Sequence, residues 1–196
     1  GGKRYSQDLP FDKEDIPFID IVLYSHDHYD HLDYDSVNLL KNKVGQFIVP
    51  LGVGSRLEGW GVPTGKINEL DWWDAIEHSG IQFISTPARH FSGRSLFDQN
   101  STLWTSWVIQ SEETNIFYSG DSGYGPHFKE IGAQYGPFDF TMIECGQYDD
   151  RWADIHLTPE ETVQAHLDVN GKLMMPIHWS AFTLAFHEWT DPIERV

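Results

Sequence analysis

The sequence has little cysteine and little positive charge, and both shortages narrow its range of functions. Among its 196 residues is one cysteine, Cys145, which excludes a disulfide within the chain and a zinc site built from cysteines alone. The 13 Lys and Arg residues stand against 30 Asp and Glu residues, so the formal net charge is −17. Nucleic-acid binding relies on clustered Lys and Arg that displace counterions. We therefore predict no nucleic-acid partner.

Long apolar runs and internal repeats are also missing from the sequence. No stretch approaches the roughly 18 apolar residues of a transmembrane helix, and no signal-peptide pattern opens the chain. We therefore expect no transmembrane segment, and a protein that is cytoplasmic or peripherally associated with a membrane. A homodimer is an alternative to a monomer that the sequence leaves open.

What the sequence does contain is enough apolar material for a folded core. Hydrophobic residues make up 40% of the chain and aromatic residues 14%, which excludes a disordered acidic tail. The length suits a single domain over residues 1–196. Cys145 lies in the stretch Met-Ile-Glu-Cys-Gly, which reads as the end of a buried strand, so we expect an unreactive buried thiol.

Apolar runs of strand length alternate with helical patterns along the chain. They predict strands at 19–24, 47–50, 81–85, 104–109, 116–119, 140–143 and 173–177, after an extended lead-in over residues 1–18. Helices are expected through 37–40, near 126–135 and from 158 to about 170. The last helix has a clear start, because Thr158 can cap it and Glu161 completes a capping box. This alternation predicts an α/β fold with helices outside sheet layers.

Ligand-type residues cluster directly after the first predicted strand, in the segment His26-Asp27-His28-Tyr29-Asp30-His31. Imidazole and carboxylate groups are what zinc and iron accept as ligands. A solvated polar loop is the alternative, but the compact H-x-H-x-D-H pattern favours a metal site. Three further residues of this kind follow other predicted strands, where ligands collect in α/β folds: His90, Asp121 and His178.

This ordered set of residues resembles the metallo-β-lactamase superfamily. Two further stretches, Leu70-Asp71-Trp72-Trp73 and His156-Leu157-Thr158-Pro159-Glu160-Glu161, are most similar to N-acylphosphatidylethanolamine-hydrolysing phospholipase D and its bacterial relatives. The resemblance implies a metallo-β-lactamase-like αββα sandwich. By comparison with that family, we expect the sequence to lack part of the N-terminal strands and the C-terminal end.

The resemblance also implies two divalent metal ions, zinc in the first place, with iron or manganese as alternatives. One ion would be held by His26, His28 and His90, the other by Asp30, His31 and His178, and Asp121 would bridge them. The implied reaction is phosphodiester hydrolysis of phospholipase D type, on N-acylphosphatidylethanolamine-like lipids, through a hydroxide held by the two metals. The expected catalytic residues are Asp30 and His156, and the expected substrate contacts are His156, Tyr148 and Trp179.

Other functions stay open at this point. The same metal pair could serve a lactonase or another C–O or P–O hydrolase with a small-molecule substrate. A binding or scaffold protein that keeps the fold without catalysis is disfavoured, because all seven expected ligand positions are filled. Asp33 could support a ligand histidine or cap the following helix, and the latter is favoured slightly. The remaining histidines receive structural interpretations only: His78, His127, His166 and His187.

Overall fold

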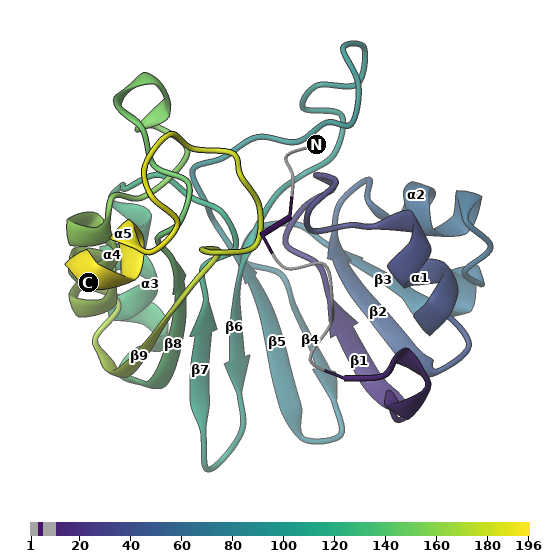
Figure 1. The fold of residues 1–196 in the computed structure, drawn as a ribbon. Coiled ribbons are helices and arrows are strands. Elements are labelled where there is room, and N and C mark those ends of the chain that lie inside the picture. Colours follow the sequence, from purple (N-terminus) through teal and green to yellow (C-terminus); the bar gives the residue numbers. More distant parts are fainter. Residues whose placement is uncertain (1–3, 6–10) are drawn as a thin grey trace. The chain divides into compact units, whose positions relative to one another are not determined.

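The computed structural model describes residues 4–5 and 11–196, which form two compact units (Figure 1). The first unit comprises described residues 11–71 together with Phe91–Trp104. The second unit comprises residues 4–5, Trp72–His90 and Thr105–Val196. Each unit has its own sheet and its own apolar core. The prediction of one domain over residues 1–196 stays a prediction.

A parallel three-stranded sheet organises the first unit, in the order β1 (Ile19–Leu23), β2 (Val44–Pro50) and β3 (Ile67–Leu70). Parallel neighbours need a crossover, and the helices α1 (Tyr34–Leu40) and α2 (Gly54–Gly59) supply the two crossovers. Each helix buries an apolar residue against the sheet, Val37 from α1 and Leu57 from α2, in one cluster with Phe47 of β2. Two short 3-10 helices, η1 (Lys13–Asp15) and η2 (Thr64–Lys66), complete the unit.

The second unit is built on a six-stranded mixed sheet. Its strands lie in chain order: β4 (Ala75–His78), β5 (Ile81–Thr86), β6 (Ser106–Gln110), β7 (Asn115–Tyr118), β8 (Phe138–Glu144) and β9 (Gly171–Ile177). Strands β4 to β7 pair antiparallel, whereas β7, β8 and β9 are parallel and are connected by α3 (His127–Tyr135) and α4 (Pro159–Asp168). The 3-10 helix η3 (Asp150–Trp152) lies between β8 and α4, and α5 (Asp191–Arg195) follows β9.

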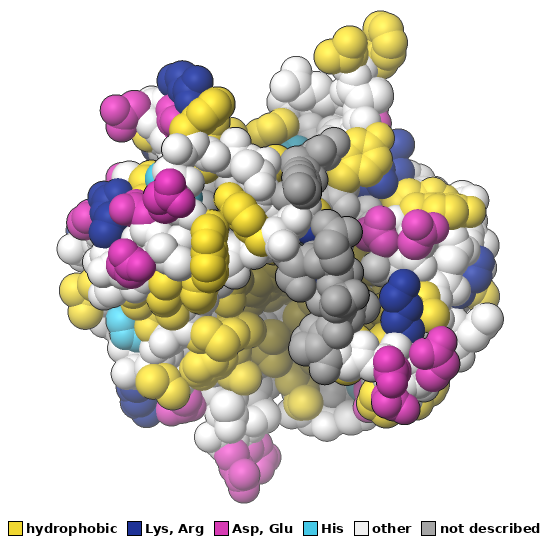
Figure 2. Space-filling view, in the orientation of Figure 1, with side chains coloured by type: hydrophobic (Ala, Val, Ile, Leu, Met, Phe, Trp, Pro, Cys, Tyr) yellow, Lys and Arg dark blue, Asp and Glu magenta, His cyan; other side chains and the backbone are white. Residues whose placement is uncertain are grey.

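The two faces of the six-stranded sheet differ in their packing partners. On one face, Phe117 and Ile143 pack with Phe128 of α3 and Ala165 of α4 in a fully buried cluster. Side chains that alternate along a strand with the core-facing ones point to the opposite face of the sheet. On β9 these are Leu173 and Met175, which are 62% and 44% exposed. Hydrophobic side chains gather over β7 to β9 on this second face (Figure 2). The second unit therefore has an apolar face outside its own core.

Most of the predicted elements are confirmed, with boundaries shifted by one to three residues. Thr158 and Glu161 form the predicted capping box, and Asp33 caps α1 by accepting a hydrogen bond from the Ser36 N–H at 2.7 Å. The sequence interpretation missed β3 and β4, because each has four residues and lies beside glycine-rich or aromatic segments. The lead-in predicted for residues 1–18 lies partly outside the described residues. Within the described chain, none of the helices has the length and apolar character of a membrane span.

Candidate metal centre

In the first unit, residues 26–31 form a histidine loop directly after β1. The Nε2 atom of His26 lies 2.9 Å from Nδ1 of His28, and the ring of His31 lies 4.3 Å from that of His26. The Asp30 carboxylate is 3.6 Å from Nε2 of His31. The loop turns tightly, since the His31 and Leu32 N–H groups both donate to the carbonyl oxygen of His28. The tight turn brings the ring nitrogens of the loop together.

Asp27 anchors the histidine loop from inside the first unit. Its side chain is fully buried, accepts a hydrogen bond from the Gly93 N–H at 2.8 Å, and pairs with Arg56 at 3.3 Å. Arg56 also pairs with Asp98 at 2.7 Å. These contacts engage both carboxylate oxygens of Asp27 within the first unit, so Asp27 supports the histidine loop.

Arg94 holds the histidine loop at both of its ends. Its Nη1 donates to the carbonyl oxygen of Asp27 at 2.7 Å and to that of Leu32 at 2.6 Å. The guanidinium lies 4.0 Å from the centre of the Tyr29 ring, and the Tyr29 hydroxyl donates to the Arg94 carbonyl. The sequence interpretation missed Arg94, because an arginine 62 residues from Leu32 gives no local signal of this contact.

In the second unit, ligand-type side chains lie at the carboxyl ends of the strands. The strands β5, β7, β8 and β9 run in the same direction, so their carboxyl ends share one edge of the sheet. His90 follows β5, Asp121 follows β7, Glu144 ends β8, and His178 follows β9 directly. This edge is where α/β sheets place their functional groups.

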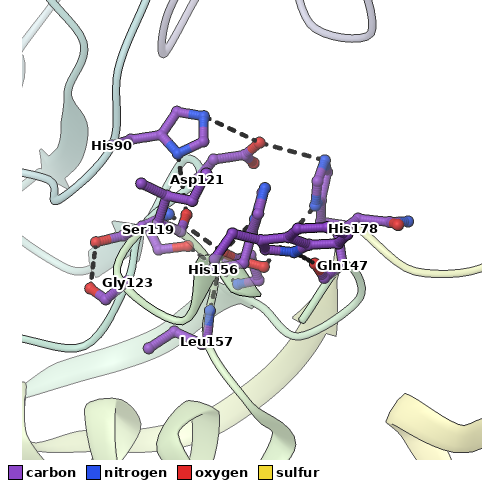
Figure 3. A network of polar contacts seen from close by, with 12 residues as sticks. His90, Ser119, Asp121, Gly123, Gln147, His156, Leu157 and His178 are labelled. Carbon is purple, nitrogen blue, oxygen red and sulfur yellow. Dashed lines mark hydrogen bonds and ion pairs between the residues drawn. The ribbon is translucent and has the colours of Figure 1, made fainter. Parts of the chain in front are cut away.

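Asp121 lies between two imidazole rings (Figure 3). Its Oδ2 atom is 3.8 Å from Nε2 of His90 and 3.4 Å from Nε2 of His178, and its side chain is 4% exposed. The Nδ1 atom of His90 lies 2.9 Å from the carbonyl oxygen of Ile155. Because a carbonyl can only accept, Nδ1 carries the proton, and Nε2 is the nitrogen that a metal could bind.

Glu144 and His156 form a buried pair beside this group. Glu144 is fully buried, and its Oε1 accepts hydrogen bonds from Nδ1 of His156 at 2.9 Å and from the N–H groups of Ser122 and Leu157. Burial acts to raise the pKa of Glu144, but the facing His156 holds that pKa below its ordinary value. Burial acts to lower the pKa of His156, and the Glu144 carboxylate raises it above the ordinary histidine value.

The sequence interpretation did not single out Glu144. In this stretch the sequence interpretation considered only Cys145, which is buried as predicted. Burial, together with the Glu144 charge, raises the pKa of the Cys145 thiol to about 12. A usable signal was present, because Glu144 is an ionisable residue at the end of an apolar run, as His178 is at the end of its own run.

The structure places Tyr148 and Trp179 in packing contacts of the second unit. The Tyr148 ring stacks on His187 at 4.1 Å, and its hydroxyl bonds the Asp191 carboxylate. The Trp179 Nε1 donates to the carbonyl oxygen of Pro176. Their substrate contacts stay predictions. Two other histidines have the structural contacts expected of them, with His127 beside Ser122 and His166 bonded to Thr141.

The donor atoms of each unit fit divalent cations. In the second unit, donor atoms of His90, Asp121 and His156 lie within 4.8 Å of one another, and the same holds for Glu144, His156 and His178. In the first unit, two histidine nitrogens lie 2.9 Å apart. Imidazoles together with carboxylates suit zinc and iron, and the lack of thiolate donors at these positions is no obstacle for either.

A family model described as "Beta-lactamase superfamily domain" matches residues 1–179. The chain belongs to this family. Among relatives of this beta-lactamase superfamily chain, an uncharacterized protein of Mycobacterium tuberculosis is 46% identical over 92% of the chain and 50% of its own length. The N-acyl-phosphatidylethanolamine-hydrolyzing phospholipase D 1 of Caenorhabditis elegans is 34% identical over 96% of the chain and 56% of its own length.

A third relative has a different named activity. The "Probable L-ascorbate-6-phosphate lactonase UlaG" of Salmonella paratyphi B is 24% identical over 84% of the chain and 51% of its own length. The chain thus spans about half the length of these curated relatives.

Solved structures confirm the fold class of this beta-lactamase superfamily chain. A possible metal-dependent hydrolase from Veillonella parvula matches with a TM-score of 0.74, over 98% of the chain and 75% of that structure, at 13% identity. A metallo-beta-lactamase fold protein from Bacillus subtilis matches with a TM-score of 0.67, over 90% of the chain and 69% of that structure, at 15% identity. The predicted metallo-β-lactamase-like α/β fold is therefore correct.

Proposed function

We propose that this chain is the metal-binding part of a phosphodiesterase of phospholipase D type that hydrolyses N-acylphosphatidylethanolamine-like lipids. The observation that carries the metal dependence is Asp121, whose buried carboxylate lies between Nε2 of His90 and Nε2 of His178. The substrate class is supported by the 34% identity to the Caenorhabditis elegans phospholipase over nearly the whole chain.

The proposed ligands are the seven residues that the sequence indicates. His26, His28 and His90 would hold one ion, Asp30, His31 and His178 the other, and Asp121 would bridge them. This assignment is supported by family membership and by the donor geometry within each unit taken separately. Two divalent ions, when bound, neutralise charge on the phosphoryl oxygens and activate water for attack on phosphorus.

His156 is the proposed proton donor of the reaction. Its Nδ1 is committed to the Glu144 carboxylate, so Nε2 is the atom that would meet a phosphoryl or leaving-group oxygen. Burial acts to lower the pKa of His156, yet the Glu144 charge raises that pKa above the ordinary histidine value, in the direction that suits a proton donor. Asp30, at the exposed end of the histidine loop, is proposed to accept a hydrogen bond from the attacking water.

A lactonase is the second candidate, and the relationship to the Salmonella lactonase favours it. The two candidates differ in the bond that is cleaved, so a substrate panel separates them. The panel contains N-acylphosphatidylethanolamine, a bis-aryl phosphodiester, a lactone and a structured RNA, each tested with protein of measured metal content.

The decisive variant is Asp121→Asn, with Asp139→Asn as a matched control, since Asp139 is an exposed carboxylate of the second unit that pairs with Lys172. We expect two metal equivalents and lipid hydrolysis in the wild type and in the control, and loss of both in Asp121→Asn. Turnover of the lactone without the lipid would contradict the phospholipase proposal. Fewer than one bound metal in the wild type would contradict metal-dependent catalysis.

A further inference from the structure

The loop between β5 and β6 carries two exposed apolar side chains at its turn. Leu96 and Phe97 are 94% and 97% exposed, more than any other large hydrophobic side chain that the structure describes. This part of the loop, Phe91–Trp104, belongs to the first unit, and hydrophobic side chains stand at its end, at the upper right of the view (Figures 1 and 2). Adjacent exposed side chains of this size mark an interaction surface. We call Leu96 and Phe97 the apolar tip.

The turn that carries the apolar tip is fixed by one carboxylate. Asp98 Oδ1 accepts hydrogen bonds from the N–H groups of Arg94 at 2.9 Å and Ser95 at 2.7 Å. Its Oδ2 pairs with Arg56 of α2 at 2.7 Å. These contacts give the turn a defined conformation. Because exposing apolar side chains to water is unfavourable, a defined conformation that exposes two of them suits an apolar partner.

Aromatic side chains with polar groups lie at the base of this loop. Tyr29 is 62% exposed, the centre of its ring lies 4.0 Å from the Arg94 guanidinium, and its hydroxyl donates to the Arg94 carbonyl at 2.8 Å. The same guanidinium lies 5.2 Å from the centre of the Trp60 ring, which contacts the exposed ring of Tyr34. Tyrosine and tryptophan concentrate where a membrane meets water, because each combines an apolar ring with a polar group. An apolar tip with Tyr and Trp at its base has the composition of a membrane-contacting loop.

The charge around the apolar tip differs from that of the whole chain. The formal net charge of −17 opposes electrostatic binding to anionic lipids. Residues 79–111, however, contain a single carboxylate, Asp98, together with two arginines, Arg89 and Arg94. The segment of the tip therefore has no run of carboxylates that would repel lipid phosphates. We propose that Leu96 and Phe97 insert into the surface of a lipid bilayer, through apolar contact rather than through charge.

Insertion of the apolar tip also has a consequence for the histidine loop of the first unit. Arg94 Nη1 donates to the carbonyl oxygen of Asp27 at 2.7 Å, and the Tyr29 hydroxyl donates back to Arg94, so the two loops are joined. Insertion thus brings the histidine loop to the lipid surface, where phospholipid phosphates lie. In this respect the inference rests on the proposed function, which has a phospholipid as substrate. Binding to a bilayer can be measured without turnover, so the two are tested separately.

The first measurement places a fluorophore at the apolar tip. Cys145 is buried, so Phe97→Cys provides an accessible thiol for an environment-sensitive label such as NBD. We expect its emission to rise and shift to the blue when phosphatidylcholine vesicles are added, and spin-labelled lipids to quench it. The control carries the label at Phe18→Cys, because Phe18 is another exposed phenylalanine of the first unit. Emission from the control should not change.

The second measurement is sedimentation with the same vesicles. Leu96→Ser/Phe97→Ser should weaken vesicle binding roughly tenfold or more, because two large apolar side chains no longer leave water. The matched control is Phe18→Ser/Leu39→Ser, which replaces the same two residue types at separate exposed positions of the first unit. It should bind vesicles like the wild type. Urea unfolding checks that both double variants are folded.

Unchanged vesicle binding in Leu96→Ser/Phe97→Ser, or a wild type that binds no phosphatidylcholine vesicles, would overturn the inference. So would a dimeric wild type that becomes a monomer in this variant, because the tip would then be a contact between copies of the chain. Binding through the tip with turnover of a lactone but not of the lipid would contradict the proposed function and leave the inference intact. Lipid hydrolysis without binding through the tip would support the proposed function and overturn the inference.

Discussion

The backbone of Gly146 lies directly against the carbonyl group of His178. A Cβ atom on Gly146 would come within 1.7 Å of the His178 carbonyl oxygen, a distance that no side-chain rotation can relieve. His178 itself has a left-handed backbone with φ 63°, a conformation that is uncommon for a residue other than glycine. Glycine at position 146 is therefore part of what places a proposed metal ligand.

We predict that Gly146→Ala displaces His178 and destabilises the protein by about 3 kcal/mol. Urea unfolding measures the stability, and Zn²⁺ titration measures the site. Gly59→Ala is the control, because a Cβ at Gly59, in α2, meets nothing within 4 Å. A Gly146→Ala protein with wild-type stability and affinity would show that the close approach has no role.

Arg94 should control the order of the histidine loop. Arg94→Met keeps the apolar stem but leaves the carbonyl groups of Asp27 and Leu32 without their guanidinium donor, at an expected loss of about 2 kcal/mol. Hydrogen exchange should be faster at the amides of residues 28–32. Arg151→Met, which removes an exposed arginine paired with Asp149, should change neither measurement. Equal exchange rates in both variants would contradict the role of Arg94 in holding the histidine loop.

His127 should make the folded state sensitive to acid. Burial, and then the charge of Arg89, lowers the pKa of His127 from 6.5 to about 4. The unfolded chain thus binds the proton more readily, so the stability contributed by neutral His127 is complete above pH 6.5 and is lost as the pH falls toward 4. At 1.36 kcal/mol per pKa unit, the loss between pH 7 and 4 is about 3 kcal/mol.

The measurement is the free energy of unfolding of metal-free wild type and His127→Gln at several pH values. The wild type should lose more stability than the variant over that range, because both share every other titrating group. Parallel curves would mean that His127 is not held neutral by the fold.

The capping box of α4 gives a fourth prediction. Thr158 Oγ1 accepts a hydrogen bond from the Glu161 N–H, and the Glu161 carboxylate accepts one from the Thr158 N–H. Thr158→Ala should destabilise the protein by about 1 kcal/mol in thermal or urea unfolding. Thr114→Ala, at an exposed position of the β6–β7 turn, should have little effect. A similar loss in both variants would rule out a specific contribution of the cap.

Local patterns allowed much of this fold to be predicted. The strands that surround the candidate centre have continuous apolar runs, and the helix starts at Asp33 and Thr158 follow from side chains within three residues of their partners. The candidate ligand residues could be singled out because each lies in the segment that follows a strand. A sequence shows such signals because the ligand-type residue and its strand, or the cap and its helix, are neighbours along the chain.

The supporting residues could not be predicted in the same way. Arg94 meets the histidine loop across 62 and 67 residues, and Glu144 meets His178 across 34 residues of chain. Their contacts depend on how the strands and loops pack in three dimensions. In a single sequence, Glu144 and Arg94 cannot be told from other charged residues, because their partners are determined by the tertiary structure.

The pairing of β8 with β9 has a consequence for how the gene can change. Glu144 stands opposite Ile177 in that ladder, and His178 is the next residue along β9. Side chains alternate between the two faces of a strand, so inserting or deleting one residue in β9 would exchange its faces and move His178 out of line with Glu144. Length variation among homologues should therefore be absent within β9 and be found instead in the turn between β6 and β7.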